Sequence, residues 1–152
     1  QTDNYFPDRT IFGSPAEENL YSLLTQTDFY KSNSDKIKII PQFPIGEYIK
    51  ATYNKFIPKY RVDFLFTLSE NGKEKSLILE YDGVEYHTKN PEIVTAHNFS
   101  REYLDYDLER QLELESYGYK FLRINKFTLR PKSNNETSSD ILNNFLIHSF
   151  NN

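Results

Sequence analysis

Three carboxylates lie on or beside two apolar stretches that are candidates for neighbouring strands. Asp63 falls in the middle of the alternating segment 60–68, and Glu80 ends the apolar run 77–79. Asp82 follows two residues later and shares the face of Glu80 for as long as the chain stays extended. Because paired strands lie about 4.8 Å apart, Asp63 and Glu80 can approach each other at one end of a sheet.

Two carboxylates that meet in this way form a candidate metal site. Carboxylates in close contact repel each other and raise each other's pKa unless a cation lies between them. A hard cation with oxygen ligands, Mg²⁺ or Mn²⁺, removes that repulsion, and it can activate water and neutralise charge at a phosphate. The competing interpretation is that these acids form ion pairs with Arg or Lys at a strand end. The residue pattern by itself leaves both interpretations open.

The elements that must position these acids follow from capping signals, turn residues and the period of the apolar side chains. In chain order, we expect a helix over 14–27, strand pieces over 37–40 and 43–48, a strand over 60–68, a strand over 76–81, a helix over 100–117, a strand over 119–124 and a short helix capped by Asp140. Loops are expected over 50–58, 88–99 and 131–139. The α-β-β-β-α-β order predicts an α/β fold, with a mixed sheet and helices packed on it.

Local signals support the individual elements. Ser14 and Glu17 are spaced as a capping box around Pro15, which suits the first helical position. The pair Asn71-Gly72 marks a tight hairpin turn between the two central strands. Gly118 fits the end of the long helix. The apolar stripe expected on that helix consists of Leu104, Leu108 and Leu112.

The chain is long enough for one domain with a core. Its 152 residues include 12 Tyr and 12 Phe, which supply ample apolar area. We expect a single domain over 14–150, preceded by an irregular lead-in over 1–13. The sequence contains no Met, so we expect it to be part of a longer protein.

The composition excludes several classes of chemistry. The absence of Cys rules out disulfides, thiolate zinc sites and Cys nucleophiles. The three His, at positions 87, 97 and 148, have no zinc-helix spacing. The chain has no apolar run of the roughly 18 residues that a membrane span needs, and no signal-peptide pattern at its start. We expect a cytoplasmic protein without a membrane partner.

The charge is unevenly distributed along the chain. The net charge is −4, but segments 31–61 and 118–132 each carry a balance of +5, whereas 62–117 carries −8. An acidic block between basic ones suits a metal site with phosphate-binding margins. Ordinary solvated surfaces give the same totals, so charge alone does not decide between them.

Taken together, the motifs resemble those of the PD-(D/E)XK nuclease superfamily, in its very-short-patch-repair endonuclease branch, with the DUF559 group most similar. The matching pieces span about residues 14–126 in the same order: Ser14-Pro15-Ala16-Glu17, Gln42-Phe43-Pro44-Ile45-Gly46, Arg61-Val62-Asp63-Phe64, Leu77 to Gly83 with His87, Asp107-Leu108-Glu109-Arg110 and Gly118 to Ile124. The resemblance implies a restriction-endonuclease-like core and metal-dependent hydrolysis of DNA. The RNA-binding RAP domains of organelles share the general core and the Glu-x-Asp-Gly ending.

The resemblance also assigns the metal site by position. It implies that Asp63 and Glu80 hold Mg²⁺ or Mn²⁺, helped by a backbone carbonyl near Tyr81. Asp82 stands where the family usually has a Lys two residues after the second acid. This departure leaves the general base open. His87 is the leading substitute, because a neutral imidazole accepts a proton near pH 7.

Further residues are assigned to catalytic support or to substrate binding. One acid of the first helix is expected to reach the metal through water, and we assign Glu18 because Glu17 has the capping role. Gln42 can hydrogen-bond a phosphate or the attacking water. Arg110 is expected to hold a phosphate or to orient Glu80, although an ion pair with Asp107 explains it equally well. Lys59 and Lys89 are expected to stabilise the negative charge that develops on the phosphate in the transition state.

The leading prediction is therefore a metal-dependent endonuclease that acts on DNA, with RNA as a variant of the same chemistry. One alternative is a catalytically inactive nucleic-acid-binding module, which the missing Lys motivates. Another is an interaction domain of a larger DNA-processing protein. One small nuclease site cuts one strand, so cutting both strands needs two sites, as in a homodimer.

Overall fold

The computed structural model describes residues 12–53, 60–81, 101–125 and 127–151, with side chains of the long helix from residue 106 onward. The predicted loop over 88–99 and most of the predicted loop over 50–58 lie outside these residues. Of the helices that are described, none is both long and apolar enough to cross a membrane.

Four strands form one mixed sheet within the described residues. They are β1 (Ile37–Phe43), β2 (Val62–Glu70), β3 (Lys73–Tyr81) and β4 (Lys120–Ile124). The strand order is β1-β2-β3-β4; the first two pairs are antiparallel and β3 pairs with β4 in parallel. The mixed α/β architecture expected from the sequence is therefore confirmed.

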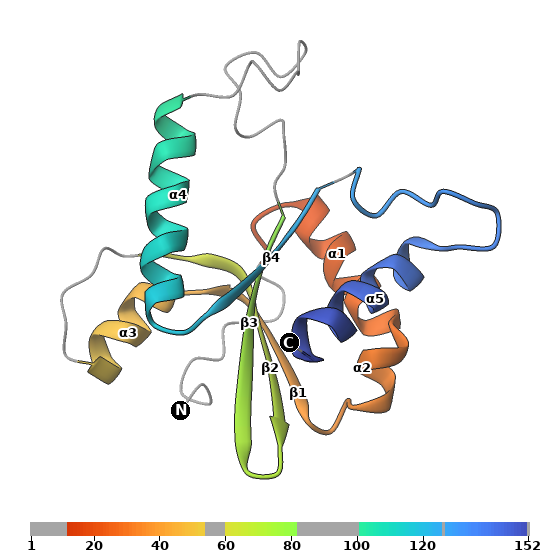
Figure 1. The fold of residues 1–152 in the computed structure, drawn as a ribbon, viewed down its shortest axis with the longest axis horizontal. Helices are drawn as coiled ribbons and strands as arrows, with labels where there is room; N and C mark the ends of the chain where they lie inside the picture. The colour runs from red at the N-terminus through yellow and green to blue at the C-terminus, as the bar shows by residue number, and fades with distance from the viewer. Residues whose placement is uncertain (1–11, 54–59, 82–100, 126, 152) are drawn as a thin grey trace.

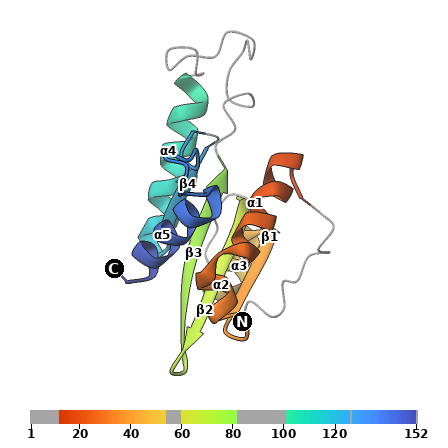
Figure 2. The ribbon, with the colours of Figure 1, turned by 90° about the vertical axis from the view of Figure 1, so that its right-hand side faces the viewer.

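Helices cover both faces of this sheet. The described helices are α1 (Pro15–Gln26), α2 (Asp28–Ser32), α3 (Ile45–Tyr53), α4 (Arg101–Ser116) and α5 (Ser138–Asn151). Figure 1 shows the sheet running between α3 and α4 on one side and α1, α2 and α5 on the other. The second view, in Figure 2, brings α1, α2 and α5 to the front of the sheet.

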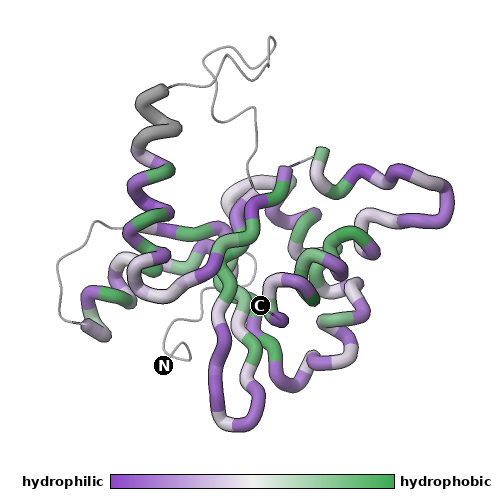
Figure 3. The backbone as a smooth tube through the Cα atoms, viewed as in Figure 1, coloured by the Kyte–Doolittle hydropathy of each residue, from purple (hydrophilic) through white to green (hydrophobic). Residues whose placement is uncertain are grey.

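The central strands are buried on both faces, and each face has its own apolar cluster. On the side of α1 and α5, Phe64 and Phe66 pack with residues of those helices, whereas Leu65 and Ile78 pack against α3 and α4. Figure 3 shows the apolar middle of the sheet and the polar tip of the β2–β3 hairpin. The middle of the sheet is thus packed on both faces, and this packing extends to the strand ends where the acids lie.

Three local predictions are confirmed. Ser14 caps α1, with its Oγ accepting a hydrogen bond from Glu17 N at 3.2 Å. Asn71 and Gly72 both have positive φ, of 52° and 76°, as a tight hairpin turn requires. Gly118, just after α4, has a φ of 93°, which suits a helix stop.

The strand predicted over 43–48 is wrong, because the chain turns into α3 directly after β1. Ile45 and Ile49 are four residues apart and both are buried, which is a helical period. Tyr48 N donates to Pro44 O at 3.1 Å, closing the first helical turn. Pro41 does not interrupt β1, since β1 lies at the sheet edge and tolerates a missing N–H.

The apolar stripe predicted for α4 is also wrong where side chains are described. Leu108 and Leu112 are 56% and 57% exposed, while Arg110 and Leu114 are the buried residues of this helix. Leu104 lies in the part of α4 whose side chains are not described. The helix turns a partly polar face inward because that face carries ion pairs to the end of the sheet.

The last helix begins earlier than predicted. Thr137 Oγ1 accepts from Asp140 N at 3.1 Å, and Asp140 Oδ2 accepts from Thr137 N at 3.0 Å. Asp140 is therefore the third helical residue of a capping box and not the cap itself.

Candidate active site

The β2–β3 ladder opens where the two predicted acids lie. The last backbone pair is Phe64 with Leu79, so Asp63 and Glu80 are the next residues on each strand. Asp63 N donates to Glu80 Oε2 at 3.0 Å, and Tyr81 N donates to Asp63 Oδ2 at 2.7 Å. Side-chain carboxylates thus take the place of the backbone carbonyls that would continue the ladder. The structure brings Asp63 and Glu80 together, as the sequence predicts.

A third acid, Glu17 of α1, joins this cluster. Its side chain is buried, with the residue only 8% exposed. Glu17 Oε1 accepts hydrogen bonds from Gly13 N at 2.9 Å and from Gln42 Nε2 at 2.8 Å. The expected capping box is only half formed, since the Glu17 carboxylate binds Gly13 N and is directed towards the end of the sheet.

Gly13 leaves the space that this carboxylate occupies. A Cβ atom on Gly13 would lie 2.5 Å from Glu17 Oε2 and 2.8 Å from Gln42 Nε2. Real Cβ atoms essentially never approach another heavy atom this closely. Any larger residue at this position therefore displaces Glu17 or Gln42.

Asp63 lies beside Glu17 and has a raised pKa. The pKa of Asp63 is raised from 3.8 to about 7; burial is the largest cause, and the negative charge of Glu17 is the next. The Tyr81 N–H and the Arg110 guanidinium lower the pKa, whereas a hydrogen bond with Glu17 raises it. Below about pH 7 Asp63 therefore retains a proton unless a cation takes its place.

Glu80 has a different partner, the buried guanidinium of Arg110. Arg110 Nη2 pairs with Glu80 Oε1, and it also contacts Asp107 Oδ1 at 3.0 Å. Arg123 Nη2 approaches Asp107 Oδ2 at 2.8 Å from strand β4. Glu80 and Arg110 are 5% and 8% exposed, so their charges are largely withdrawn from water. Arg110 therefore contacts both Glu80, which it is predicted to orient, and Asp107, the ion-pair partner of the competing interpretation.

The backbone around Gln42 is tied to the same network. Arg110 Nη1 donates to Arg61 O at 3.1 Å, and Arg61 Nη1 donates to Gln42 O at 2.7 Å. Gln42 has a φ of 51°, a left-handed conformation that is uncommon for a residue with a Cβ. The Gln42 side chain donates a hydrogen bond to Glu17. Its geometry is therefore as consistent with positioning Glu17 as with direct binding of a phosphate.

Not every predicted residue lies in the described cluster. Glu18 is exposed, and it is Glu17 that approaches Asp63. The helical period provides the signal for this, because Glu17 shares a face with the buried Leu20 and Leu24. The contribution of Arg123 had no signal in the sequence. The residues predicted at Lys59, Asp82, His87 and Lys89 lie outside the described part of the chain.

The donor set fits a hard divalent cation only in part. Glu17, which is buried, and Asp63, which is partly buried, provide oxygen ligands whose mutual repulsion a cation would relieve. Glu80, in contrast, already balances its charge with Arg110. Within the described ranges, no three His, Asp or Glu side chains are grouped so that they could hold a metal ion together.

Comparison with known proteins adds no relative to this picture, since no family model, no curated protein and no solved structure matches the chain significantly.

Proposed function

We propose that this chain is a metal-dependent nuclease domain that hydrolyses phosphodiester bonds of DNA, with a core related to that of the PD-(D/E)XK nucleases. The observation that carries the proposal is the pair of carboxyls at the opened end of β2 and β3, where the partly buried Asp63 lies beside the buried Glu17. A buried pair of like charges costs free energy, and perturbed carboxyls of this kind gather at functional sites. Binding a divalent cation for hydrolysis at a phosphate would give this carboxyl pair a function.

In this proposal Asp63 and Glu17 hold Mg²⁺ or Mn²⁺, with Glu80 and the backbone of Tyr81 beside them. The bound cation supplies an activated water and neutralises charge on the scissile phosphate. Gln42 and Gly13 orient Glu17 through the hydrogen bonds they donate to Oε1. Arg110 keeps the Glu80 carboxylate facing the end of the sheet.

The remaining roles rest on the sequence alone, since these residues lie outside the described part of the chain. We retain His87 and Asp82 as candidates for the group that accepts the proton of the attacking water. Lys59 and Lys89 remain candidates for contacts to the phosphate in the transition state.

The test is cleavage of supercoiled plasmid and of labelled single strands, with Mn²⁺ or Mg²⁺ compared with EDTA. Asp63→Asn and Glu17→Gln preserve side-chain size and are expected to lower metal-dependent cleavage by at least about a hundredfold. Glu18→Gln is the matched control on the same helix, and it should retain activity because Glu18 is exposed. Full cleavage by folded Asp63→Asn would refute the site.

A second candidate function is a nucleic-acid-binding module without catalysis. The observation that favours it is the Glu80–Arg110 ion pair, which leaves Glu80 less available to a metal than in an open acidic site. Such a module should bind DNA or RNA equally well in EDTA and in the Asp63→Asn variant. Its affinity should still fall steeply as salt concentration rises.

A further inference from the structure

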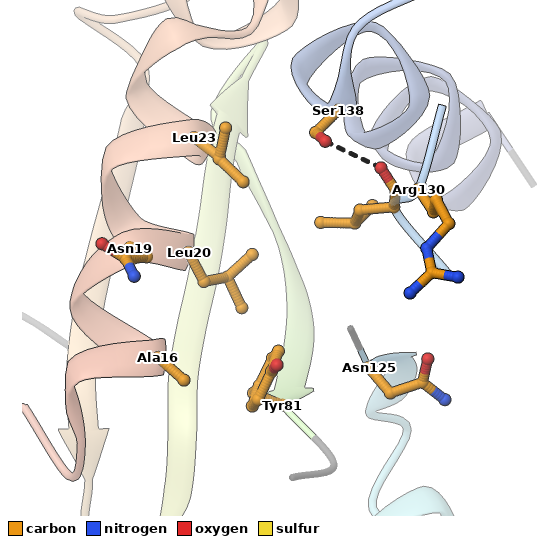
Figure 4. Close-up of a pocket in the computed structure, with 9 residues that line it drawn as sticks. Ala16, Asn19, Leu20, Leu23, Tyr81, Asn125, Arg130 and Ser138 are labelled. Atoms are coloured by element: carbon orange, nitrogen blue, oxygen red, sulfur yellow. Dashed lines mark hydrogen bonds between the residues drawn. The ribbon is translucent and has the colours of Figure 1, made fainter. Parts of the chain in front are cut away.

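A pocket of about 290 Å³ lies beside the candidate active site, between α1, the end of β3 and the segment that joins β4 to α5 (Figure 4). Its apolar wall is formed by Leu20 and Leu23 of α1 together with Leu129. In the close-up, Leu20 and Leu23 extend from α1 towards Tyr81 and Arg130. The volume is close to the lower limit of about 300 Å³ for small-molecule sites.

The opposite wall carries hydrogen-bond donors. Asn125 Oδ1 accepts from Phe127 N at 2.8 Å, from Thr128 N at 3.0 Å and from Thr128 Oγ1 at 2.9 Å. These bonds fix the amide, and its Nδ2 has no acceptor among the described residues. The oxygen of Asn125 is therefore occupied, whereas its NH₂ group is available to a ligand.

Arg130 adds a positive charge to the same wall. Its guanidinium carbon lies 5.1 Å from the centre of the Phe127 ring, a cation–π contact between two exposed side chains, and Arg130 also lines the pocket. Within the described ranges, no carboxylate forms an ion pair with this guanidinium. A ligand with an anionic group would supply the partner that Arg130 lacks there.

The pocket and the acidic cluster share two elements. On β3, the Tyr81 side chain lines the pocket while its backbone N–H binds Asp63 Oδ2. On α1, Ala16 lines the pocket and the next residue, Glu17, belongs to the acidic cluster. A ligand in the pocket therefore lies one residue away from the proposed cleavage site along both elements.

We infer that this pocket binds one nucleotide of a single-stranded nucleic acid, with the base against Tyr81 and the leucines and the phosphate at Arg130 and Asn125. A flat base with an adjacent anion matches an apolar wall that faces a positively charged donor wall. The pocket is small, about 290 Å³, which suits a single unpaired base. This inference deepens the proposed function and rests on it for the position of the cleaved phosphate.

The test is fluorescence anisotropy of a labelled ten-residue oligothymidylate, in EDTA so that binding is measured without cleavage. Arg130→Gln removes the charge, and Ala16→Leu fills the pocket while preserving helix propensity. Both should weaken binding by about tenfold, the factor expected for the loss of one charge-assisted contact or one stacked base. Lys73→Ala removes one charge at the hairpin tip and should change affinity less than about twofold.

A second measurement separates a free nucleotide from a nucleotide within a strand. Titration with thymidine monophosphate should shift the Asn125 side-chain amide signal in NMR spectra, and Ala16→Leu should abolish that shift. Tighter binding of the oligonucleotide than of the monophosphate identifies a nucleic acid as the ligand, and equal affinity identifies the free nucleotide. Unchanged affinity in both Arg130→Gln and Ala16→Leu would overturn the inference.

The inference and the proposed function fail in different ways. If the pocket variants lose binding but the wild-type protein never cleaves with Mg²⁺ or Mn²⁺, the pocket stands and the nuclease proposal falls. If metal-dependent cleavage is unaffected by Arg130→Gln and Ala16→Leu, the nuclease stands and the pocket has no part in it.

Discussion

Each end of the β2–β3 hairpin has a pair of opposite charges, but the two pairs lie in very different surroundings. At the turn, Glu70 and Lys73 are partners in the antiparallel register, and Lys73 is exposed to water. At the other end, Glu80 faces Arg110, and both are buried. Water solvates the first pair, so its presence carries little information about function. Burying the second pair costs a large desolvation free energy, which the attraction between Glu80 and Arg110 must offset.

The buried end also differs in how the backbone is satisfied. The ladder at the turn continues to the last pair, Glu70 with Lys73, whereas at the open end carboxylates accept the N–H groups of Asp63 and Tyr81. An end closed by carboxylates can exchange those bonds for others when a ligand arrives. This difference explains why we place chemistry at one end of the hairpin and not at the other.

The sharpest way to break the comparison is to remove one charge at each end. Arg110→Ala leaves Glu80 buried without its partner, and the free energy of unfolding should fall by about 3–5 kcal/mol. Lys73→Ala, the control at the turn, should change it by less than about 0.5 kcal/mol. Urea unfolding of both variants gives the values. Losses of similar size at the two ends would contradict the contrast.

The second prediction concerns pH. In the metal-free protein the pKa of Asp63 is raised to about 7 from an ordinary value of 3.8, so between these values the folded state keeps a proton that the unfolded state releases. The contribution of Asp63 to stability should therefore be fully present below about pH 4 and should be lost as pH rises through 7. Between pH 5 and pH 8 we expect this contribution to fall by about 2–3 kcal/mol, and Asp63→Asn should remove the fall.

Urea unfolding in EDTA at pH 5 and pH 8 measures the change. Asn retains an oxygen that can accept the Tyr81 N–H, so the variant removes the titration and leaves that contact possible. Asp35→Asn, at an exposed position before β1, is the matched control and should leave the fall intact. If Asp63→Asn loses as much stability as the wild-type protein between these pH values, the account of the carboxyl pair is wrong.

The third prediction uses one glycine at each end. Gly13→Ala should displace Glu17 and Gln42, and lower cleavage by roughly tenfold to a hundredfold, because a misplaced group of this kind costs that much. Gly72→Ala meets no atom within 4 Å but must adopt a φ of 76°. It should cost about 1 kcal/mol of stability without affecting cleavage. Parallel cleavage and thermal unfolding assays distinguish the two variants. Equal cleavage activity in both would refute the claim that Gly13 is needed to position Glu17.

The same contrast explains what could be predicted from the sequence. The hairpin turn at Asn71-Gly72 and the cap at Ser14 follow from the residues themselves, so both were predictable. The approach of Asp63 and Glu80 follows from strand register, which the turn fixes. Local chemistry determines all three.

The errors arose where distant partners decide the outcome. The buried face of α4 is set by Glu80 and by the apolar cluster under Leu114, and neither is visible in the spacing of the leucines. α3 follows β1 because Ile45 and Ile49 pack on the sheet, although the alternation of residues 43–48 resembles a strand. The choice of Glu18 over Glu17 gave the capping role too much weight, since Glu17 contacts Gln42 and Asp63 through the tertiary fold.

The most direct test of the central claim is Mn²⁺ binding, measured by titration calorimetry at several pH values. The account predicts one saturable site per chain, lost in Asp63→Asn and retained in Glu18→Gln. Binding should release a proton below about pH 7, because the cation replaces the proton that the Glu17–Asp63 pair otherwise holds. Affinity should then rise by up to about tenfold per pH unit below 7 and level off above it. Absence of a saturable site, or equal binding by Asp63→Asn, would contradict the claim that this carboxyl pair is a metal site.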